Sequence, residues 1–472
     1  MAVPGIKGII LTLLFSALAA SALGQSADSD QPAADVVPVQ TESAGDQADD
    51  SAVESSEEAP LEEEPEAQAM AEPQAYGFLQ SHRLFSETLD EERRYNIYLP
   101  ASYYAKPEYN YPVLYLIDGD YNFLSIAGMV ENLAKGNNPL IPEMIVVGIS
   151  AKGIARYRNN MQPPLPLGKG GDADDFLRFI NEELKTEING KYRSSGFDIL
   201  EGQSIGGLFV VNSLFASSDS FSAYIAISPM MWWEDYRMEG KVKDYLKKIK
   251  APAKKLYLSL ANEPRMGVYG LVEQLDRNRP VGVDWDFKHF TEENHDSVTL
   301  PALRHALKDL FQGWYISYKD LAAYENFEAV REHYLAYLKR FNLQQAIPAF
   351  TYKALMHQYP EEEKAEKAAS LYLQTTQHLP LSLIDLRNHL AALAIKEKEY
   401  DKAGELLQAS FEENANDFTV QQAISKWHRA QKQLDQAEEA AVKALTLARQ
   451  QQQRDWLIAI LEDELAEIQQ SK

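Results

Sequence analysis

The sequence predicts an α/β protein with a doubly wound, mostly parallel sheet, followed by an all-α region. Between about residues 80 and 318, short apolar runs rich in Val, Ile, Leu and Tyr alternate with helical patterns. Parallel strands that are covered on both faces have such continuous apolar runs. After about residue 318 the strand signals vanish and helix-forming residues dominate. A long alternation of strands and helices favours an open sheet with helices on both faces, whose active groups gather at the carboxyl ends of the strands.

The individual strands follow from the local pattern. An early antiparallel strand is expected at 93–99, where polar and apolar residues alternate. Buried strands are expected at 112–117, 144–149, 197–200, 224–228 and 255–261, and an alternating strand at 285–290. The clearest helical patterns lie at 174–188 and 208–217.

The helical region contains an internal repeat. Tyr400-Asp401-Lys402-Ala403 recurs thirty-four residues later as Leu434-Asp435-Gln436-Ala437, and the same step backwards leads to Glu366-Lys367-Ala368-Ala369. A period of this length, with a small residue at the start of the second helix, indicates tetratricopeptide (TPR) repeats. We therefore expect a TPR-like domain at 319–472. A plain helical bundle is the alternative, because most of the Trp, Gly and Tyr positions of the first TPR helix are missing.

The N-terminal residues have the composition of a targeting segment and a linker. Lys7 precedes an apolar run that ends in small residues, so 1–24 is expected to be a signal peptide. An uncleaved membrane anchor is the alternative, but the run is short for a span. Residues 25–75 carry fifteen acidic and no basic residues and almost no aromatics, which predicts a disordered acidic linker. The α/β domain is then expected at 76–318.

The overall composition restricts the function classes. The net charge is −24 and no basic cluster stands out, so a nucleic-acid partner is not expected. The chain has no cysteine, which excludes disulfides and a lipidated cysteine, and with the signal peptide this favours a bacterial periplasmic or secreted protein. Its nine histidines are scattered without metal-ligand spacing, so neither a metal nor another cofactor is expected.

The most informative motif is Gly202-Gln203-Ser204-Ile205-Gly206. It joins an expected strand to an expected helix, which is the setting of a nucleophile elbow, where a sharp turn presents a serine hydroxyl. The backbone can pack closely around such a turn only if the flanking positions lack Cβ atoms. Ser204 is therefore the candidate nucleophile.

A serine nucleophile needs a general base and an orienting acid. His295 follows an expected strand in a polar loop and is the candidate base, whereas His289 lies within that strand. Glu263 lies just past the carboxyl end of another strand and precedes His295, so it is the candidate acid. Asp284 and Asp286 are alternatives, but they lie on the strand and are expected to face solvent.

Further residues are candidates for the rest of the site. The oxyanion needs two backbone N–H donors, which are expected from Ile205 and from Gly119 or Asp120. Trp232 and Trp233 follow a strand and could line a substrate pocket or belong to the core. Arg158 also follows a strand end and could contact an anionic substrate or hold a loop.

Together these segments resemble the esterase D-like family of α/β-hydrolases, which includes siderophore and feruloyl esterases. The resemblance covers residues 80–311 and is carried by four blocks, at 113–119, 202–208, 227–233 and 293–295. It implies that Ser204 is the nucleophile and His295 the base. The chain departs from the family pattern at 158–163 and at Asp296.

The leading expectation is a secreted serine hydrolase that cleaves small carboxylic esters through an acyl-enzyme. An acyltransferase on the same fold is the second possibility. The third is a non-catalytic protein whose helical region binds a partner protein. In all three cases no stable membrane anchoring is expected after removal of the signal peptide.

Overall fold

The computed structural model describes residues 79–117, 119–136, 138–151, 153–165, 169–233, 254–324, 327–345, 348, 351, 384–396 and 398–472. The expected signal peptide, the acidic linker and the repeat copy at 366–369 lie outside these residues. Within them, no helix combines the length and the apolar character that a membrane crossing requires.

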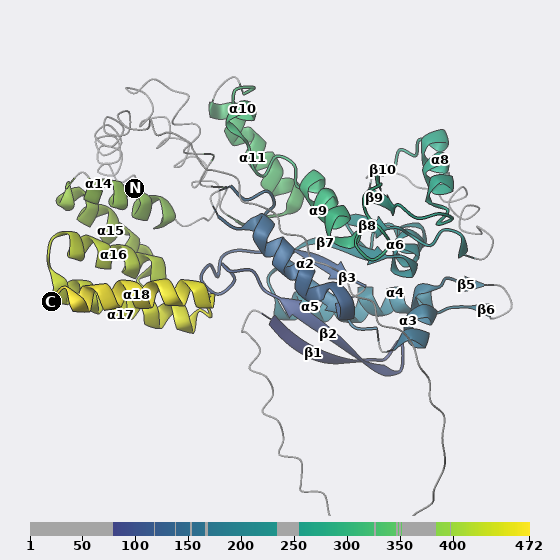
Figure 1. Cartoon of the computed structure of the whole chain (residues 1–472), viewed down its shortest axis with the longest axis horizontal. Helices are drawn as coiled ribbons and strands as arrows, with labels where there is room; N and C mark the ends of the chain where they lie inside the picture. The colour runs from purple at the N-terminus through teal and green to yellow at the C-terminus, as the bar shows by residue number, and fades with distance from the viewer. Residues whose placement is uncertain are drawn as a thin grey trace, which may run out of the picture.

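The centre of the molecule is an eight-stranded sheet with the strand order β1-β2-β4-β3-β7-β8-β9-β10 (Figure 1). The strands span Leu79–Ser86 (β1), Glu91–Tyr98 (β2), Tyr111–Leu116 (β3), Ile145–Ile149 (β4), Ser194–Gln203 (β7), Ala223–Ile227 (β8), Lys254–Ala261 (β9) and Val283–Phe290 (β10). β2 pairs antiparallel with β1 and β4, and every other pair is parallel. This confirms the predicted fold class; β1 and a short β5–β6 ribbon (Pro164–Leu165 and Lys169–Gly170) were not predicted.

Helices cover both faces of the sheet because alternate residues of a strand point to opposite sides. On β3, Val113 and Tyr115 belong to one core and Leu114 and Leu116 to the other. The helices over the first core are α4 (Ala173–Arg178), a π-helix at Phe179–Leu184, α5 (Lys185–Lys191), α6 (Ile205–Ala216) and α8 (Val268–Asn278). The helices over the second core are α2 (Gly119–Ala134), α9 (Thr299–Leu310), α10 (Tyr318–Leu321) and α11 (Phe327–Phe341). The expected helix at 174–188 therefore contains a π-helical segment.

Helix α11 packs into the core of the sheet. The Phe341 ring lies 4.8 Å from that of Phe197 and 5.0 Å from that of Phe311, and the Tyr337 hydroxyl donates a 3.0 Å hydrogen bond to the Phe311 carbonyl. Side chains as far as Leu343 belong to this core. The expected domain boundary near 318 thus precedes a helix that shares its core with β7 and α9.

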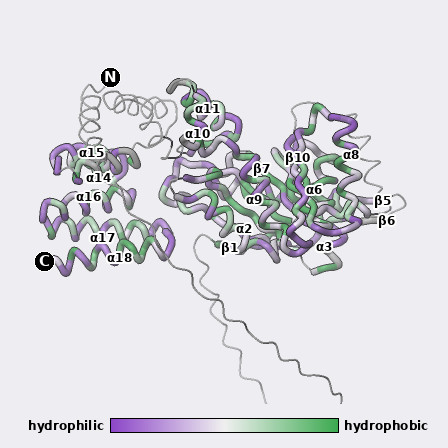
Figure 2. The backbone as a smooth tube through the Cα atoms, turned by 45° about the horizontal axis from the view of Figure 1, so that its top comes forward, coloured by the Kyte–Doolittle hydropathy of each residue, from purple (hydrophilic) through white to green (hydrophobic). Residues whose placement is uncertain are grey.

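The C-terminal helices stack as a separate layer (Figure 1). They are α14 (Ile384–Lys396), α15 (Tyr400–Asn414), α16 (Phe418–Ala430), α17 (Leu434–Gln450) and α18 (Asp455–Gln470). Figure 2 shows hydrophilic and hydrophobic segments alternating along them, as expected of amphipathic helices. The two described repeat copies occupy equivalent places, since Tyr400 and Leu434 begin α15 and α17, and Ala403 and Ala437 are fully buried.

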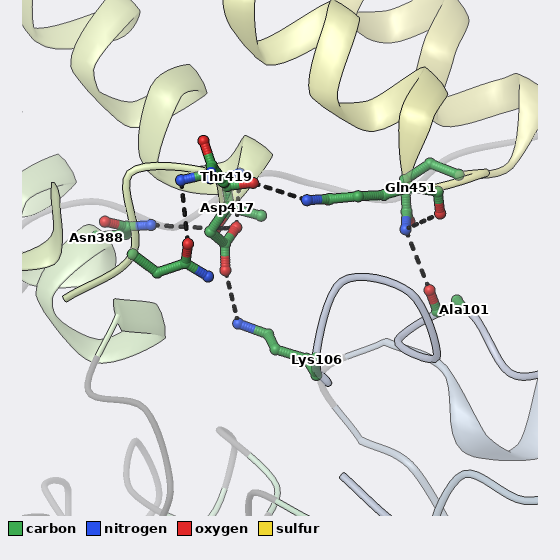
Figure 3. A network of polar contacts seen from close by, with 9 residues as sticks. Ala101, Lys106, Asn388, Asp417, Thr419 and Gln451 are labelled. Atoms are coloured by element: carbon green, nitrogen blue, oxygen red, sulfur yellow. Dashed lines mark hydrogen bonds and ion pairs between the residues drawn. The ribbon is translucent and has the colours of Figure 1, made fainter. Parts of the chain in front are cut away.

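The helical layer contacts the loop between β2 and β3, at the edge of the sheet where β3 begins. Asp417, which is 1% exposed, lies 3.1 Å from the Lys106 ammonium, and its carboxylate also caps α16 by accepting the Thr419 N–H (Figure 3). Arg454 pairs with Glu131 at 3.0 Å. These contacts attach the helices at the edge opposite the carboxyl ends of the parallel strands.

Candidate active site

Ser204 occupies the sharp turn between β7 and α6. Its φ of 56° and ψ of −116° are strained for a residue with a side chain, and such strain is common at functional sites. A Cβ at Gly202 would lie 2.7 Å from the carbonyl carbon of Gly206, so glycine is required for this close approach. The turn is held by hydrogen bonds of 2.9 Å from the Ser204 N–H to the Ile227 carbonyl and from the Met230 N–H to the Ser204 carbonyl.

His295 and Glu263 meet at the same edge of the sheet. The Nδ1 atom of His295 lies 2.6 Å from Oε2 of Glu263, which is the second residue after β9. The Glu263 side chain is 14% exposed and that of His295 39%. Because Nδ1 faces the carboxylate, Nε2 is the ring nitrogen left for proton transfer. Oε1 of Glu263 is buried and accepts no hydrogen bond from the described residues.

The alternative candidates lie elsewhere along β10. The side chains of Asp284 and Asp286 are 65% and 43% exposed and face Lys255 and His305, respectively. His289 is exposed and shares a hydrogen bond of 3.1 Å with the Tyr269 hydroxyl. Of the three carboxylates that the sequence offered, Glu263 is the one that contacts His295.

The loop that carries His295 is also tied to the elbow. The Gln203 amide donates from Nε2 to the His295 carbonyl and accepts, at Oε1, a hydrogen bond from the Thr299 hydroxyl. In the sequence, Gln203 stands out only as part of the motif, and Thr299 carries no local signal. No local pattern could have paired them, because ninety-six residues separate the two.

A cavity of about 810 Å³ opens beside Ser204 and His295. It brings together six of the predicted site residues, namely Ser204, Ile205, His295, Trp232, Trp233 and Arg158. Its other lining residues are Tyr121, Asn122, Ile154, Tyr157, Gln162, Gln203, Met230 and Asp296. Trp232 is 46% exposed, whereas Trp233 is 5% exposed and packs in the core, so the two tryptophans differ in their environment.

The two candidate oxyanion donors come from different elements. Ile205 is the first residue of α6, where helix geometry leaves the N–H without an intrahelical acceptor. Gly119 begins α2, and a Cβ there would lie 2.4 Å from the carbonyl carbon of Gly148. Asp120 uses Oδ2 to accept the Ala151 N–H at 2.5 Å. Neither Gly119 nor Asp120 lines the cavity, although Tyr121 of the same helix does.

The sheet domain is similar to known esterases. Residues 86–266 match the model of the family described as "Putative esterase". The ferri-bacillibactin esterase BesA of Bacillus subtilis is 30% identical over 244 residues, which are 45% of this chain and 83% of BesA. The siderophore triacetylfusarinine C esterase of Aspergillus fumigatus is 34% identical over 132 residues, 26% of this chain and 45% of that protein.

Solved structures show the same fold. An IroE-like serine hydrolase from Shewanella oneidensis is 28% identical with a TM-score of 0.53, covering 64% of this chain and 99% of that one. An uncharacterised protein from Capnocytophaga ochracea, 14% identical with a TM-score of 0.50, covers 83% of this chain and 99% of its own and is similar in fold alone. The chain therefore belongs to the esterase family of α/β-hydrolases and is a carboxylic ester hydrolase.

Proposed function

We propose that this esterase works through an acyl-enzyme formed on Ser204. Ser204 Oγ attacks the ester carbonyl carbon while His295 Nε2 takes its proton, and the protonated imidazole then gives that proton to the departing alkoxide. Water, activated by the same nitrogen, hydrolyses the acyl-enzyme. Glu263 fixes the ring so that Nε2 faces the reaction. The proposal rests on the 2.6 Å contact between His295 and Glu263. His295 and the strained turn at Ser204 line the same cavity.

The negative charge of the tetrahedral intermediate requires donors that are already in place. The Ile205 N–H is one such donor, because it adjoins the nucleophile and begins α6. We assign the second to the N–H of Gly119 or Asp120, in the first turn of α2, which follows β3 at the same edge of the sheet.

The proposed substrate is a bulky ester of the siderophore type, the class named for the two relatives above. The cavity volume of about 810 Å³ would admit a large acyl or alcohol group. Trp232 offers a partly exposed aromatic surface, and Arg158 offers an exposed cation at the same cavity. Guanidinium groups form charge-assisted hydrogen bonds with anionic substituents.

The remaining proposals concern location and the helical region. Residues 1–24 would export the chain to a bacterial periplasm or medium, and 25–75 would act as an acidic spacer. The C-terminal helices would be TPR-like repeats that bind a protein partner. Fractionation of cells that produce the full chain, with N-terminal sequencing of the product, tests the export signal.

Ser204→Ala tests the mechanism. The variant is expected to lose turnover of p-nitrophenyl esters and labelling by a fluorophosphonate, and the wild type to show a covalent acyl adduct by intact-protein mass spectrometry. Ser217→Ala, an exposed serine just after α6, is the matched control. Unchanged turnover in Ser204→Ala would refute the mechanism, whereas preferential transfer of the acyl group to added alcohols would indicate an acyltransferase.

A further inference from the structure

Both ends of the Gln203 amide form hydrogen bonds that connect the turn at Ser204 to the segment carrying the proposed base. The loop between β10 and α9, residues 291–298, carries His295 and is called the base loop below. Nε2 donates to the His295 carbonyl, and Oε1 accepts from the Thr299 hydroxyl. The two contacted residues bracket the segment that runs from the proposed base to the first residue of α9. The amide therefore holds this segment by one hydrogen bond at each of its two ends.

The other hydrogen bonds of the base loop run in different directions. The Asn262 N–H donates to the Glu293 carbonyl at 2.8 Å, which ties the loop to the end of β9. Asn294 Oδ1 accepts from the N–H groups of Asp296 at 2.9 Å and Ser297 at 3.1 Å, which stiffens the loop internally. None of these bonds joins the loop to β7, the strand that leads to Ser204.

We propose that Gln203 is a positioning residue that sets the separation of His295 from Ser204, an inference that rests on the roles proposed above for these two residues. Gln203 is peptide-bonded to Ser204, so any movement of the His295 backbone relative to Gln203 is also a movement relative to the nucleophile. The His295 side chain is 39% exposed, so its position depends on how its own backbone is held. Small displacements of catalytic groups cost large factors in rate.

The chemistry of the side chain explains why an amide stands at this position. The two contacts need one donor and one acceptor at the same time, and a primary amide supplies both. A glutamate would keep the acceptor for Thr299 but lose the donor to the His295 carbonyl. A methionine of similar length would lose both.

The test compares four variants by kcat and KM with p-nitrophenyl acetate, butyrate and benzoate. Gln203→Met is expected to lower kcat by roughly tenfold or more, by the same factor for each acyl group and with KM unchanged. Inactivation by diisopropyl fluorophosphate, which needs little of the substrate pocket, should slow by a similar factor. Thr299→Val removes one bond and should lose less, and Thr299→Ser should recover the rate lost in Thr299→Val. Gln203→Glu sets a carboxylate oxygen against the His295 carbonyl oxygen, so its loss should be at least as large as that of Gln203→Met.

The control for the change from glutamine to methionine is Gln408→Met, at an exposed residue of α15 whose amide contacts Glu412. Wild-type kcat in Gln203→Met would overturn the proposal. So would a loss that falls on KM and varies with the acyl group, because that pattern marks direct contact with substrate. If Gln203→Met does not fold, equal rates for Thr299→Val and Thr299→Ser would overturn it instead. Activity that survives Ser204→Ala would refute the proposed mechanism, which is a separate outcome.

Discussion

Oε2 of Glu263 lies 2.6 Å from Nδ1 of His295, although thirty-two residues separate them in sequence. Each residue follows the end of a neighbouring parallel strand, β9 or β10, and the parallel pairing brings these ends to one edge of the sheet. The same edge carries Ser204 at the end of β7.

Glu263→Gln preserves the shape of the side chain and removes its charge. The imidazolium that the proposed mechanism forms at His295 would then lose its stabilising partner, so kcat/KM should fall about a hundredfold or more. Steady-state kinetics with a p-nitrophenyl ester measure the change. Asp286→Asn, the same neutralisation on β10 at a carboxylate that faces His305, should keep wild-type kcat/KM. An equal loss in both variants would remove Glu263 from the mechanism.

Arg158→Met should weaken the binding of anionic esters. The guanidinium is exposed at the cavity and is expected to pair with a negative group of the substrate, so KM for an ester with a carboxylate or catecholate substituent should rise about three- to tenfold. KM for the matching neutral ester should stay constant. An equal rise in KM for both esters would show that Arg158 shapes the cavity but does not recognise the charge of the substrate.

Gly202→Ala should disrupt the turn at Ser204. The new Cβ would lie 2.7 Å from the Gly206 backbone, which cannot yield without moving α6, so stability should fall by about 2 kcal/mol and esterase activity should be lost. Gly190→Ala is the matched control, since a Cβ there meets no atom within 4 Å and alanine favours the helix. Denaturant unfolding with activity assays distinguishes the two.

Phe341→Ala tests whether α11 belongs to the hydrolase core. Phe341 is fully buried between Phe197 and Phe311, so its truncation should cost about 3–5 kcal/mol and should lower the temperature at which esterase activity is lost. Phe85→Ala, at a residue that is 54% exposed on β1, should have a small effect. If Phe341→Ala left the thermal loss of activity unchanged, α11 would be independent of the hydrolase core.

The central strands β3, β4, β8 and β9 could be predicted because they are short, mostly buried and apolar on both faces, which leaves a local signal. The turn at Ser204 could be predicted because its two glycines and one serine satisfy a steric demand within five residues. Strand β1 left a weaker signal, because it is an edge strand on which exposed and partly buried side chains alternate. The π-helical segment at Phe179–Leu184 has no local sequence pattern that distinguishes it from an α-helix.

The sequence by itself determined the fold class, most of the strands of the sheet, and Ser204, His295 and Glu263 as candidate site residues. Each of these follows from a local pattern or from a position after a strand. Only the tertiary structure decided which carboxylate meets His295, that Gln203 and Thr299 hold the base loop, and that α11 packs beneath the sheet. These contacts join residues far apart in sequence. They depend on how strands pair and helices pack, and no local pattern records that geometry.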